Sequence, residues 1–250
     1  MRRIKLTVAY DGTAYRGWQI QKNGVTIEAM LDQALRALTG EEIHVMGTSR
    51  TDSGVHAMGN VAVFDTEARM AAGKFSYALN QRLPEDIRIQ DSCEVPLDFH
   101  PRYQETVKTY EYRILNREFP LPAHRLNTYF VYYPVDEKRM QEAAACLVGE
   151  HDFQSFCAAG AQVKTTVRTI YDLQVTRNGD LITIRITGNG FLYNMVRIIA
   201  GTLLKVGTGE WPPGYMAEIL EARDRRKAGP TAPAKGLTLM EIRFQGEKNN

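Results

Sequence analysis

The residues best suited to chemistry lie in a short polar segment, residues 48–57, in the first half of the chain. There an arginine, Arg50, and an aspartate, Asp52, are separated by a single residue. A carboxylate held in such a segment can act as a nucleophile or as an acid–base group. The same residues also suit a tight turn, in which Asp52 bonds to nearby backbone and Gly54 takes the positive-φ position. Residue types alone leave both interpretations open.

Two expected strands flank this segment and would position it. Apolar residues alternate over residues 42–46 and nearly fill residues 60–64, and both patterns are typical of strands. A loop between two buried strands presents its side chains rigidly at one rim of a sheet. The elements around Asp52 therefore favour a fixed carboxylate.

A second group of candidates lies on an expected strand over residues 107–114. Side chains alternate between the two faces of a strand, so Lys108, Tyr110 and Tyr112 share one face. Such a row is commonly cross-strand packing. It is also a suitable platform for stacking an extruded base.

A third candidate, Arg197, lies in an expected helix that begins near residue 191 and is strongly apolar. A buried arginine needs an anion or a hydrogen-bonding site, unless its head reaches solvent. The turn before this helix, residues 188–190, contains two glycines and could cradle a phosphate, although the Walker and dinucleotide patterns are absent.

Two further segments carry weaker signals. Residues 10–19 combine aromatic side chains with Arg16; the rings could stack on exposed bases or pin the loop to the core. His100, which precedes Pro101, could act as a base, although a lone histidine in this setting is more often structural.

These segments resemble the TruA family of tRNA pseudouridine synthases. Residues 49–57 resemble its signature loop, residues 10–19 its N-terminal segment and residues 107–114 its second motif. Family members also carry an arginine in the helix that matches the one with Arg197. The resemblance covers nearly the full chain. Ser49 and Asn60 stand where Gly and Gln are usual in the family and leave the path of the loop open, and Pro101 stands where the family usually has Ala.

The resemblance implies an isomerase that converts uridine to pseudouridine at positions 38, 39 and 40 in the anticodon stem-loop of tRNA. In this interpretation Asp52 is the nucleophile, Arg197 pairs with it, and Tyr110 lies against the target uracil. Arg50 would fill the space left by the extruded nucleotide, and Arg16 and Lys108 would contact the RNA. The resemblance also implies a homodimer that binds tRNA and needs neither a cofactor nor a metal.

Composition is compatible with this function. The chain has 250 residues, 44% of them apolar and 24% charged, with a net charge of +2, as expected for a globular protein. Basic residues outnumber acidic ones in residues 160–209, which suits a polyanion, although scattered solvated side chains would give the same count. The three cysteines show neither metal-binding nor disulfide spacing. Without an apolar run of membrane-spanning length or a signal peptide, we expect a cytoplasmic protein.

The order of expected elements predicts an α+β fold. Helices are expected over residues 27–38, capped by Thr26 and ended by Gly40, over residues 74–82, and after Asp136. Residues 221–227 are expected to be a charged helix end. Further strands are expected over residues 4–8, 87–89, 128–133, 173–176, 181–187 and 237–244, with a type I′ turn at Asn178-Gly179.

This plan is compatible with two halves, residues 1–104 and 105–250. The resemblance implies two ferredoxin-like units with mainly antiparallel sheets and a cleft between them.

Two other functions stay open. The chain could be an RNA-binding module without catalysis. It could also be a hydrolase that uses an aspartyl nucleophile on a small ester or glycoside. A hydrolase of this kind needs a partner acid or a histidine relay, and the sequence offers neither at a convincing position.

Overall fold

The computed structural model describes residues 1–160 and 163–245, which form two compact units. Unit 1 comprises Met1–Glu105 and the described chain from Leu239 onward, and unit 2 comprises Thr106–Thr238. The chain therefore returns to unit 1 for its last strand. The division into domains after residue 104 stays a prediction.

The sheet of unit 1 is organised around β1 (Arg2–Tyr10), whose apolar residues are buried alternately, as the sequence predicted. Neighbouring strands follow the order β4-β1-β3-β10, and β2 also pairs with β3. β1 is antiparallel to both of its neighbours. These strands are β2 (Met46–Gly47), β3 (His56–Thr66), β4 (Ile87–Val95) and β10 (Leu237–Phe244).

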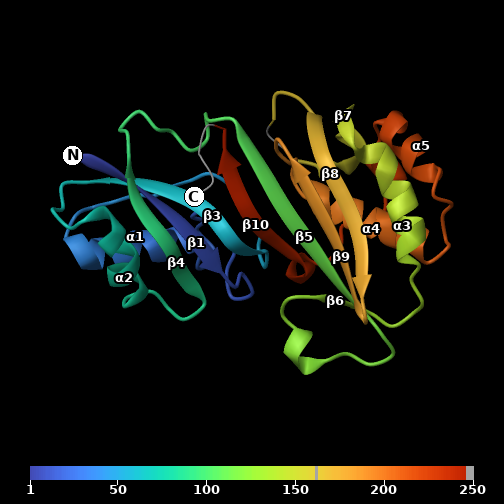
Figure 1. Cartoon of the computed structure of the whole chain (residues 1–250), viewed down its shortest axis with the longest axis horizontal. Coiled ribbons are helices and arrows are strands. Elements are labelled where there is room, and N and C mark those ends of the chain that lie inside the picture. The colour runs from blue at the N-terminus through green and yellow to red at the C-terminus, as the bar shows by residue number, and fades with distance from the viewer. Residues whose placement is uncertain (161–162, 246–250) are drawn as a thin grey trace. The chain divides into compact units, whose positions relative to one another are not determined.

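Two helices, α1 (Ile27–Thr39) and α2 (Phe75–Asn80), contact each other in unit 1 (Figure 1). The ends of α1 confirm the sequence prediction, because the Thr26 hydroxyl accepts from the Ala29 N–H (3.4 Å) and Gly40 has a φ of 74°. A hydroxyl at the N-cap satisfies a free helical N–H, and a glycine at the C-terminus takes the left-handed conformation at little cost.

The sheet of unit 2 contains β5-β9-β8-β7 in that order. These strands pair antiparallel, whereas β6 pairs parallel with β5. Their bounds are β5 (Thr106–Asn116), β6 (Tyr129–Val131), β7 (Gly149–Asp152), β8 (Val167–Asn178) and β9 (Leu181–Gly188).

Three helices lie together on one side of the β8–β9 hairpin (Figure 1): α3 (Glu137–Ala144), α4 (Met195–Gly207) and α5 (Tyr215–Ala222). Short 3₁₀ turns connect the elements: η1 (Ala72–Lys74), η2 (Pro122–His124), η3 (Ala145–Leu147), η4 (Gln154–Phe156), η5 (Arg225–Lys227) and η6 (Ala234–Gly236). The predicted α+β class with mainly antiparallel strands is confirmed.

The strand predicted over residues 42–46 was wrong except at its last residue. Ile43 and Val45 are buried as expected. The Val45 N–H, however, donates to the Asp32 carboxylate (2.9 Å) in α1 rather than to a neighbouring strand. β3 is longer than predicted and begins at His56, so the polar segment enters the sheet earlier than its composition indicated.

The predicted hairpin is present, but the type I′ assignment of its turn was wrong. Asn178 pairs with Leu181, which makes Gly179 and Asp180 the central residues. Of residues 178–181, all of them described, only Gly179 has a positive φ (57°). A type I′ turn requires positive φ at both central residues, whereas a glycine at the first alone matches type II′.

Two helix boundaries also differ from the prediction. α4 begins at Met195 rather than near residue 191, because Asn194 adopts a left-handed conformation (φ 59°) that asparagine tolerates better than most residues. The charged segment 221–227 is divided: α5 ends at Ala222, Arg223 has a φ of 49°, and Asp224 caps η5.

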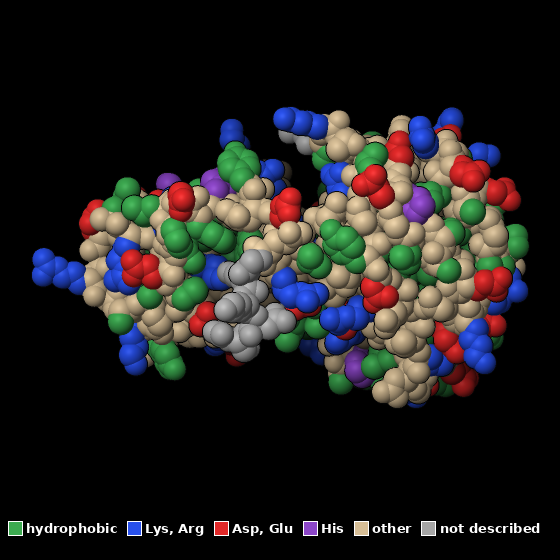
Figure 2. Space-filling model, turned by 45° about the horizontal axis from the view of Figure 1, so that its top comes forward, with side chains coloured by type: hydrophobic (Ala, Val, Ile, Leu, Met, Phe, Trp, Pro, Cys, Tyr) green, Lys and Arg blue, Asp and Glu red, His purple; other side chains and the backbone are tan. Residues whose placement is uncertain are grey.

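Charged side chains of both signs are interspersed over the face of the molecule shown in Figure 2. This distribution agrees with the small net charge of +2. Among the described residues, no helix is both long enough and apolar enough to cross a bilayer.

Candidate active site

Asp52 lies at the start of a tight turn in unit 1. Its carbonyl accepts from the Val55 N–H (3.1 Å), and Gly54 has a φ of 78°. This is the geometry that the residue types predicted, with glycine at the position that side chains disfavour. The Asp52 residue is partly buried. The backbone therefore has the turn role, and a chemical role for the side chain stays a prediction.

The aromatic loop of residues 10–19 lies directly against the Asp52 turn. The Trp18 N–H donates to the Thr51 carbonyl (3.1 Å), and the Gly54 N–H donates to the Tyr15 carbonyl (3.3 Å). A Cβ added at Gly17 would lie 2.6 Å from the Thr51 oxygen, and one at Gly12 would lie 2.0 Å from the Val55 oxygen. Only glycine permits backbones to approach this closely.

The aromatic rings of this loop serve as anchors. Trp18 is fully buried, and Tyr10 and Tyr15 are buried as well. Of the two interpretations left open by the sequence, the structure supports pinning to the core for these three rings. They hold the loop that in turn holds Asp52.

Buried polar side chains fix the path of the Asp52 loop. The Tyr10 hydroxyl bonds to the Thr51 hydroxyl (2.7 Å). The Asn60 amide donates to the Tyr10 hydroxyl (3.2 Å) and to the Ser49 carbonyl (3.0 Å). Asn60 is fully buried, so loss of these bonds would leave its amide without a hydrogen-bond partner and would destabilise the fold. Two residues that depart from the family pattern, Ser49 and Asn60, thus contact each other.

His56 links the end of the same segment to β1. Its Nδ1 accepts from the Gly12 N–H (3.1 Å) and lies 3.1 Å from the Asp11 carboxylate. Partial burial raises the pKa of Asp11, but hydrogen bonds from Thr13 and the neighbouring His56 outweigh burial and leave that pKa below its ordinary value. His56 therefore acts in unit 1 as a positioning residue.

The two arginines predicted to contact RNA from unit 1, Arg16 and Arg50, are exposed on the two loops that meet at Asp52. A third, Arg102, was missed by the sequence analysis. Its Nε donates to the Gly47 carbonyl (2.8 Å), which places residue 102 beside the start of the Asp52 loop. The only feature of the sequence that pointed to Arg102 was its position close to His100. That histidine accepts from the Arg102 N–H (3.2 Å) and stacks on Tyr103, which supports the structural interpretation of His100.

In unit 2, Lys108, Tyr110 and Tyr112 share the face of β5 predicted from their spacing. Tyr112 is fully buried and its hydroxyl donates to the Pro233 carbonyl (2.8 Å). Tyr110 is 8% exposed, and its ring lies at 84° to that of Phe191 at a centroid distance of 5.2 Å. Tyr112 is a packing residue, as expected, and Tyr110 is the ring nearer the surface.

Arg197 extends from the first turn of α4 into a defined hydrogen-bonding site. Its Nε donates to the Ala232 carbonyl (2.8 Å), and an Nη donates to the Asn194 side chain (2.7 Å). The sequence predicted that a guanidinium in this apolar helix needs such a site. The loop that supplies one of the acceptors, residues 229–236, is called the strap below.

The strap packs on α4 and holds two of the candidate residues. A Cβ at Gly201 would lie 1.9 Å from the Pro230 oxygen, and the Gly229 N–H donates to the Thr202 hydroxyl (3.0 Å). The strap then accepts from Arg197 at Ala232 and from Tyr112 at Pro233. One short loop thus fixes the Arg197 guanidinium and Tyr112, which lies on the same strand as Tyr110.

Lys108 has an unusual electrostatic environment. Burial, together with the positive charge of Arg168, lowers the pKa of its ammonium group to about 8. Burial also lowers the pKa of Arg168. Lys108 is therefore easier to deprotonate than an exposed lysine.

The structure brings together Arg16, Arg50 and Asp52 within unit 1. It places Lys108, Tyr110 and Arg197 within unit 2, on β5 and on a helix that contacts it. That both sets act on one substrate stays a prediction. Within the described ranges, no group of three or more histidine, cysteine, aspartate or glutamate residues is arranged to hold a metal ion.

A family model described as tRNA pseudouridine synthase matches residues 6–104 and 143–245. These ranges make up most of the chain and include both Asp52 and Arg197. The chain belongs to the tRNA pseudouridine synthase family. The resemblance predicted from the sequence motifs is confirmed, although Lys108 and Tyr110 lie in the stretch between the matched ranges.

Relatives of this tRNA pseudouridine synthase match it from end to end. The tRNA pseudouridine synthase A of Acetivibrio thermocellus is 48% identical over 244 residues, which cover 98% of this chain and 100% of the relative. The enzyme of the same name from Ruminiclostridium cellulolyticum is 49% identical, covering 98% of this chain and 100% of the relative. The prediction of an isomerase of the pseudouridine synthase family is thereby confirmed.

The close packing of the strap on α4 can be tested with the substitution Gly201→Ala. Alanine favours a helix over glycine by about 1 kcal/mol, but the added methyl would overlap the Pro230 carbonyl. We expect the clash to prevail and to lower the free energy of unfolding by about 1–3 kcal/mol in urea titrations. The predicted role of Arg197 further implies a lower catalytic rate, because the strap holds its guanidinium. Gly214→Ala is the matched control, since its Cβ meets nothing within 4 Å. Unchanged stability and rate in Gly201→Ala would contradict a fixed strap.

The environment of Lys108 predicts a pH-dependent stability. Its pKa is about 8 in the folded protein against an ordinary 10.5, so between these values the unfolded chain binds more protons and stability rises with pH. Lys108→Met, which lacks the buried charge, should be more stable than wild type near about pH 7. The difference should shrink towards about pH 10. Urea midpoints at several pH values measure it, and a difference that does not change with pH would refute the shifted pKa.

Proposed function

We propose that this enzyme converts uridine to pseudouridine at positions 38, 39 and 40 in the anticodon stem-loop of tRNA, with Asp52 as the nucleophile and without a cofactor. The proposal rests on one observation: the turn that contains Asp52 is fixed by hydrogen bonds to a second loop. Backbone hydrogen bonds from Trp18 and Gly54 join its turn to the aromatic loop. A nucleophile gains most when its position is fixed before the substrate arrives.

The reaction is an isomerisation and needs no other reactant. The bond between N1 of uracil and C1′ of ribose breaks, the base turns, and a bond forms between C5 and C1′. The proton on C5 leaves, and N1 gains a proton in its place. Asp52 forms the covalent intermediate that divides this exchange into two steps.

Two residues of unit 2 complete the proposed chemistry. Arg197 serves as the cation for the Asp52 carboxylate and favours its ionised form. Tyr110 stacks on the uracil, a contact worth about 1–3 kcal/mol on other aromatic platforms, and helps to remove the proton from C5. The strap supports these assignments by holding Arg197 and Tyr112 in place.

The remaining candidate residues contact the RNA rather than take part in the chemistry. A nucleotide paired in a stem must leave the duplex before it can react, which costs a few kcal/mol. Arg50, exposed beside the Asp52 turn, fills the space that the nucleotide leaves. Arg16 and Lys108 contact the strand around it. The exposed guanidinium of Arg102 is a further candidate on unit 1.

The proposal includes the setting in which the enzyme works. By family resemblance we assign it to the cytoplasm, as a homodimer in which one tRNA contacts both subunits. Size-exclusion chromatography with light scattering, with and without tRNA, tests this assignment. A monomer under both conditions would contradict it.

The catalytic proposal is tested by tritium release from tRNA that carries 5-³H-uridine. Asp52→Asn removes the nucleophile but keeps the size of the side chain, so release should fall by at least about 10⁴-fold. Binding of tRNA should remain. Asp91→Asn, at an exposed position on β4, is the matched control and should retain full activity. Chemical labelling of the treated tRNA should locate pseudouridine at positions 38–40.

Other outcomes identify the alternatives. If wild type binds tRNA without releasing tritium, the chain is an RNA-binding module. If Asp52→Asn releases tritium at the wild-type rate, Asp52 is not the nucleophile. Turnover of a small ester or glycoside, with no release from tRNA, would favour the hydrolase.

A further inference from the structure

Two cations of unit 2, Lys108 and Arg168, lie on the same face of its sheet. Lys108 on β5 is paired with Gly188 on β9, and Gly188 is paired with Ile170 on β8. Arg168 is two residues from Ile170 and so shares its face. The central position of this row is Gly188, and the end of the Phe191 ring lies 3.3 Å from where its Cβ would stand.

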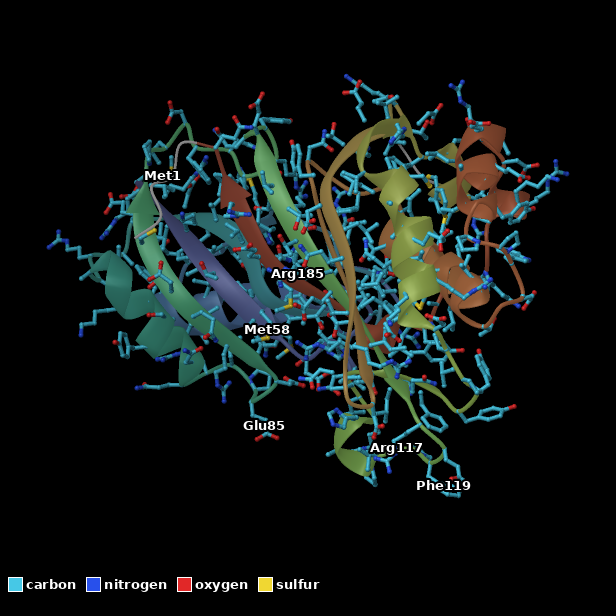
Figure 3. All side chains as sticks on the ribbon, turned by 45° about the vertical axis from the view of Figure 1, so that its right-hand side comes forward. Met1, Met58, Glu85, Arg117, Phe119 and Arg185 are labelled. Carbon is cyan, nitrogen blue, oxygen red and sulfur yellow. The ribbon has the colours of Figure 1, made fainter. Side chains whose placement is uncertain are left out.

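Neither cation has an acidic partner among the described residues. Arg168 donates to the carbonyls of Thr165 (3.0 Å) and Val167 (2.6 Å), and Lys108 takes part in no hydrogen bond or ion pair in the same ranges. Several other basic residues of unit 2 have acidic partners. Arg117 lies 3.3 Å from Asp180 and Arg185 lies 2.7 Å from Glu111; both arginines are labelled in Figure 3.

Partial burial makes this arrangement unfavourable without an anion. Both side chains are partly buried, and two like charges brought together out of water repel each other. Burial and the charge of Arg168 both lower the pKa of Lys108, whereas burial alone lowers the pKa of Arg168. An anion bound by both side chains would offset the repulsion and raise the pKa of the lysine.

The glycine-rich turn after β9 lies beside Arg168. A Cβ at Gly190 would lie 3.7 Å from the Arg168 Nε, so the turn and the guanidinium are neighbours. The Gly190 N–H donates to no acceptor within the described residues. Backbone N–H groups of such turns commonly bind anions. The sequence singled out this turn as a possible phosphate cradle, and the proposed catalytic roles give it no task.

We propose that Lys108, Arg168 and the Gly190 backbone bind one phosphodiester group of the RNA strand, next to the nucleotide whose base lies on Tyr110. The inference rests on the proposed function. Lys108 and Tyr110 are two residues apart on one strand face, about 6.6 Å along the strand. A base on Tyr110 therefore brings a phosphate of its own strand within reach of Lys108.

The test uses tRNA assembled by ligation, with one uncharged methylphosphonate replacing a single phosphate in turn along the anticodon arm. Wild type should show one position, adjacent to the modified uridine, where the replacement weakens binding by about 10-fold. Lys108→Met should bind unmodified tRNA about 10-fold less tightly than wild type. Replacement of that one phosphate should not weaken its binding further, whereas replacement of the other phosphates should act as in wild type. Arg168→Met should lose sensitivity at the same position.

Lys138→Met, at an exposed position on α3, is the control and should keep the wild-type pattern. Circular dichroism and urea unfolding verify that Lys108→Met is folded. If both variants retain wild-type sensitivity at every phosphate, the inference is overturned. Tritium release by wild type from unmodified tRNA separates the two proposals: its absence defeats the proposed function, whereas its presence with an unchanged phosphate pattern defeats this inference alone.

Discussion

The close approach of two backbones in unit 1 is the constraint on which the candidate site depends. Gly12 and Gly17 allow the aromatic loop to lie against the Asp52 turn, where a Cβ at either position would overlap a carbonyl oxygen. Hydrogen bonds from Trp18 and Gly54 then join the two loops. The Asp52 carboxylate is consequently carried by a loop whose path is set by the buried rings and glycines of the aromatic loop together with its own Thr51 and Gly54.

In unit 2, too, a glycine allows two segments of backbone to lie in close contact. Gly201 lets the strap lie directly on α4, and the strap accepts hydrogen bonds from Arg197 and Tyr112. In both units a glycine permits contact between backbones, and carbonyl oxygens then orient the functional side chain or its neighbour. Backbone acceptors suit this purpose because the fold fixes their positions and a substitution in the loop does not remove them.

Sequence patterns predicted the structure correctly where neighbouring residues alone determine it. Thr26 and Gly40 marked the ends of α1, and Gly54 marked the turn after Asp52. Contacts between distant residues could not be predicted in this way. The Asp32 carboxylate removes Val45 from a strand, Gly47 receives Arg102 from residues far along the chain, and Lys108 meets Arg168 only through the pairing of three strands. The roles of Asp52, Tyr110 and Arg197 came from family resemblance, because residue types alone allowed a turn, a packed ring and a solvated arginine.

The central claim is that a carboxylate fixed at one position performs the reaction, and Asp52→Glu tests it most directly. Glutamate retains the charge but moves the carboxylate by one methylene, so a preorganised site should lose at least about 10²-fold in rate. The measurement is the single-turnover rate of tritium release with enzyme in excess, together with the dissociation constant for tRNA. We predict a large fall in rate with unchanged binding. A rate for Asp52→Glu close to that of wild type would contradict the account.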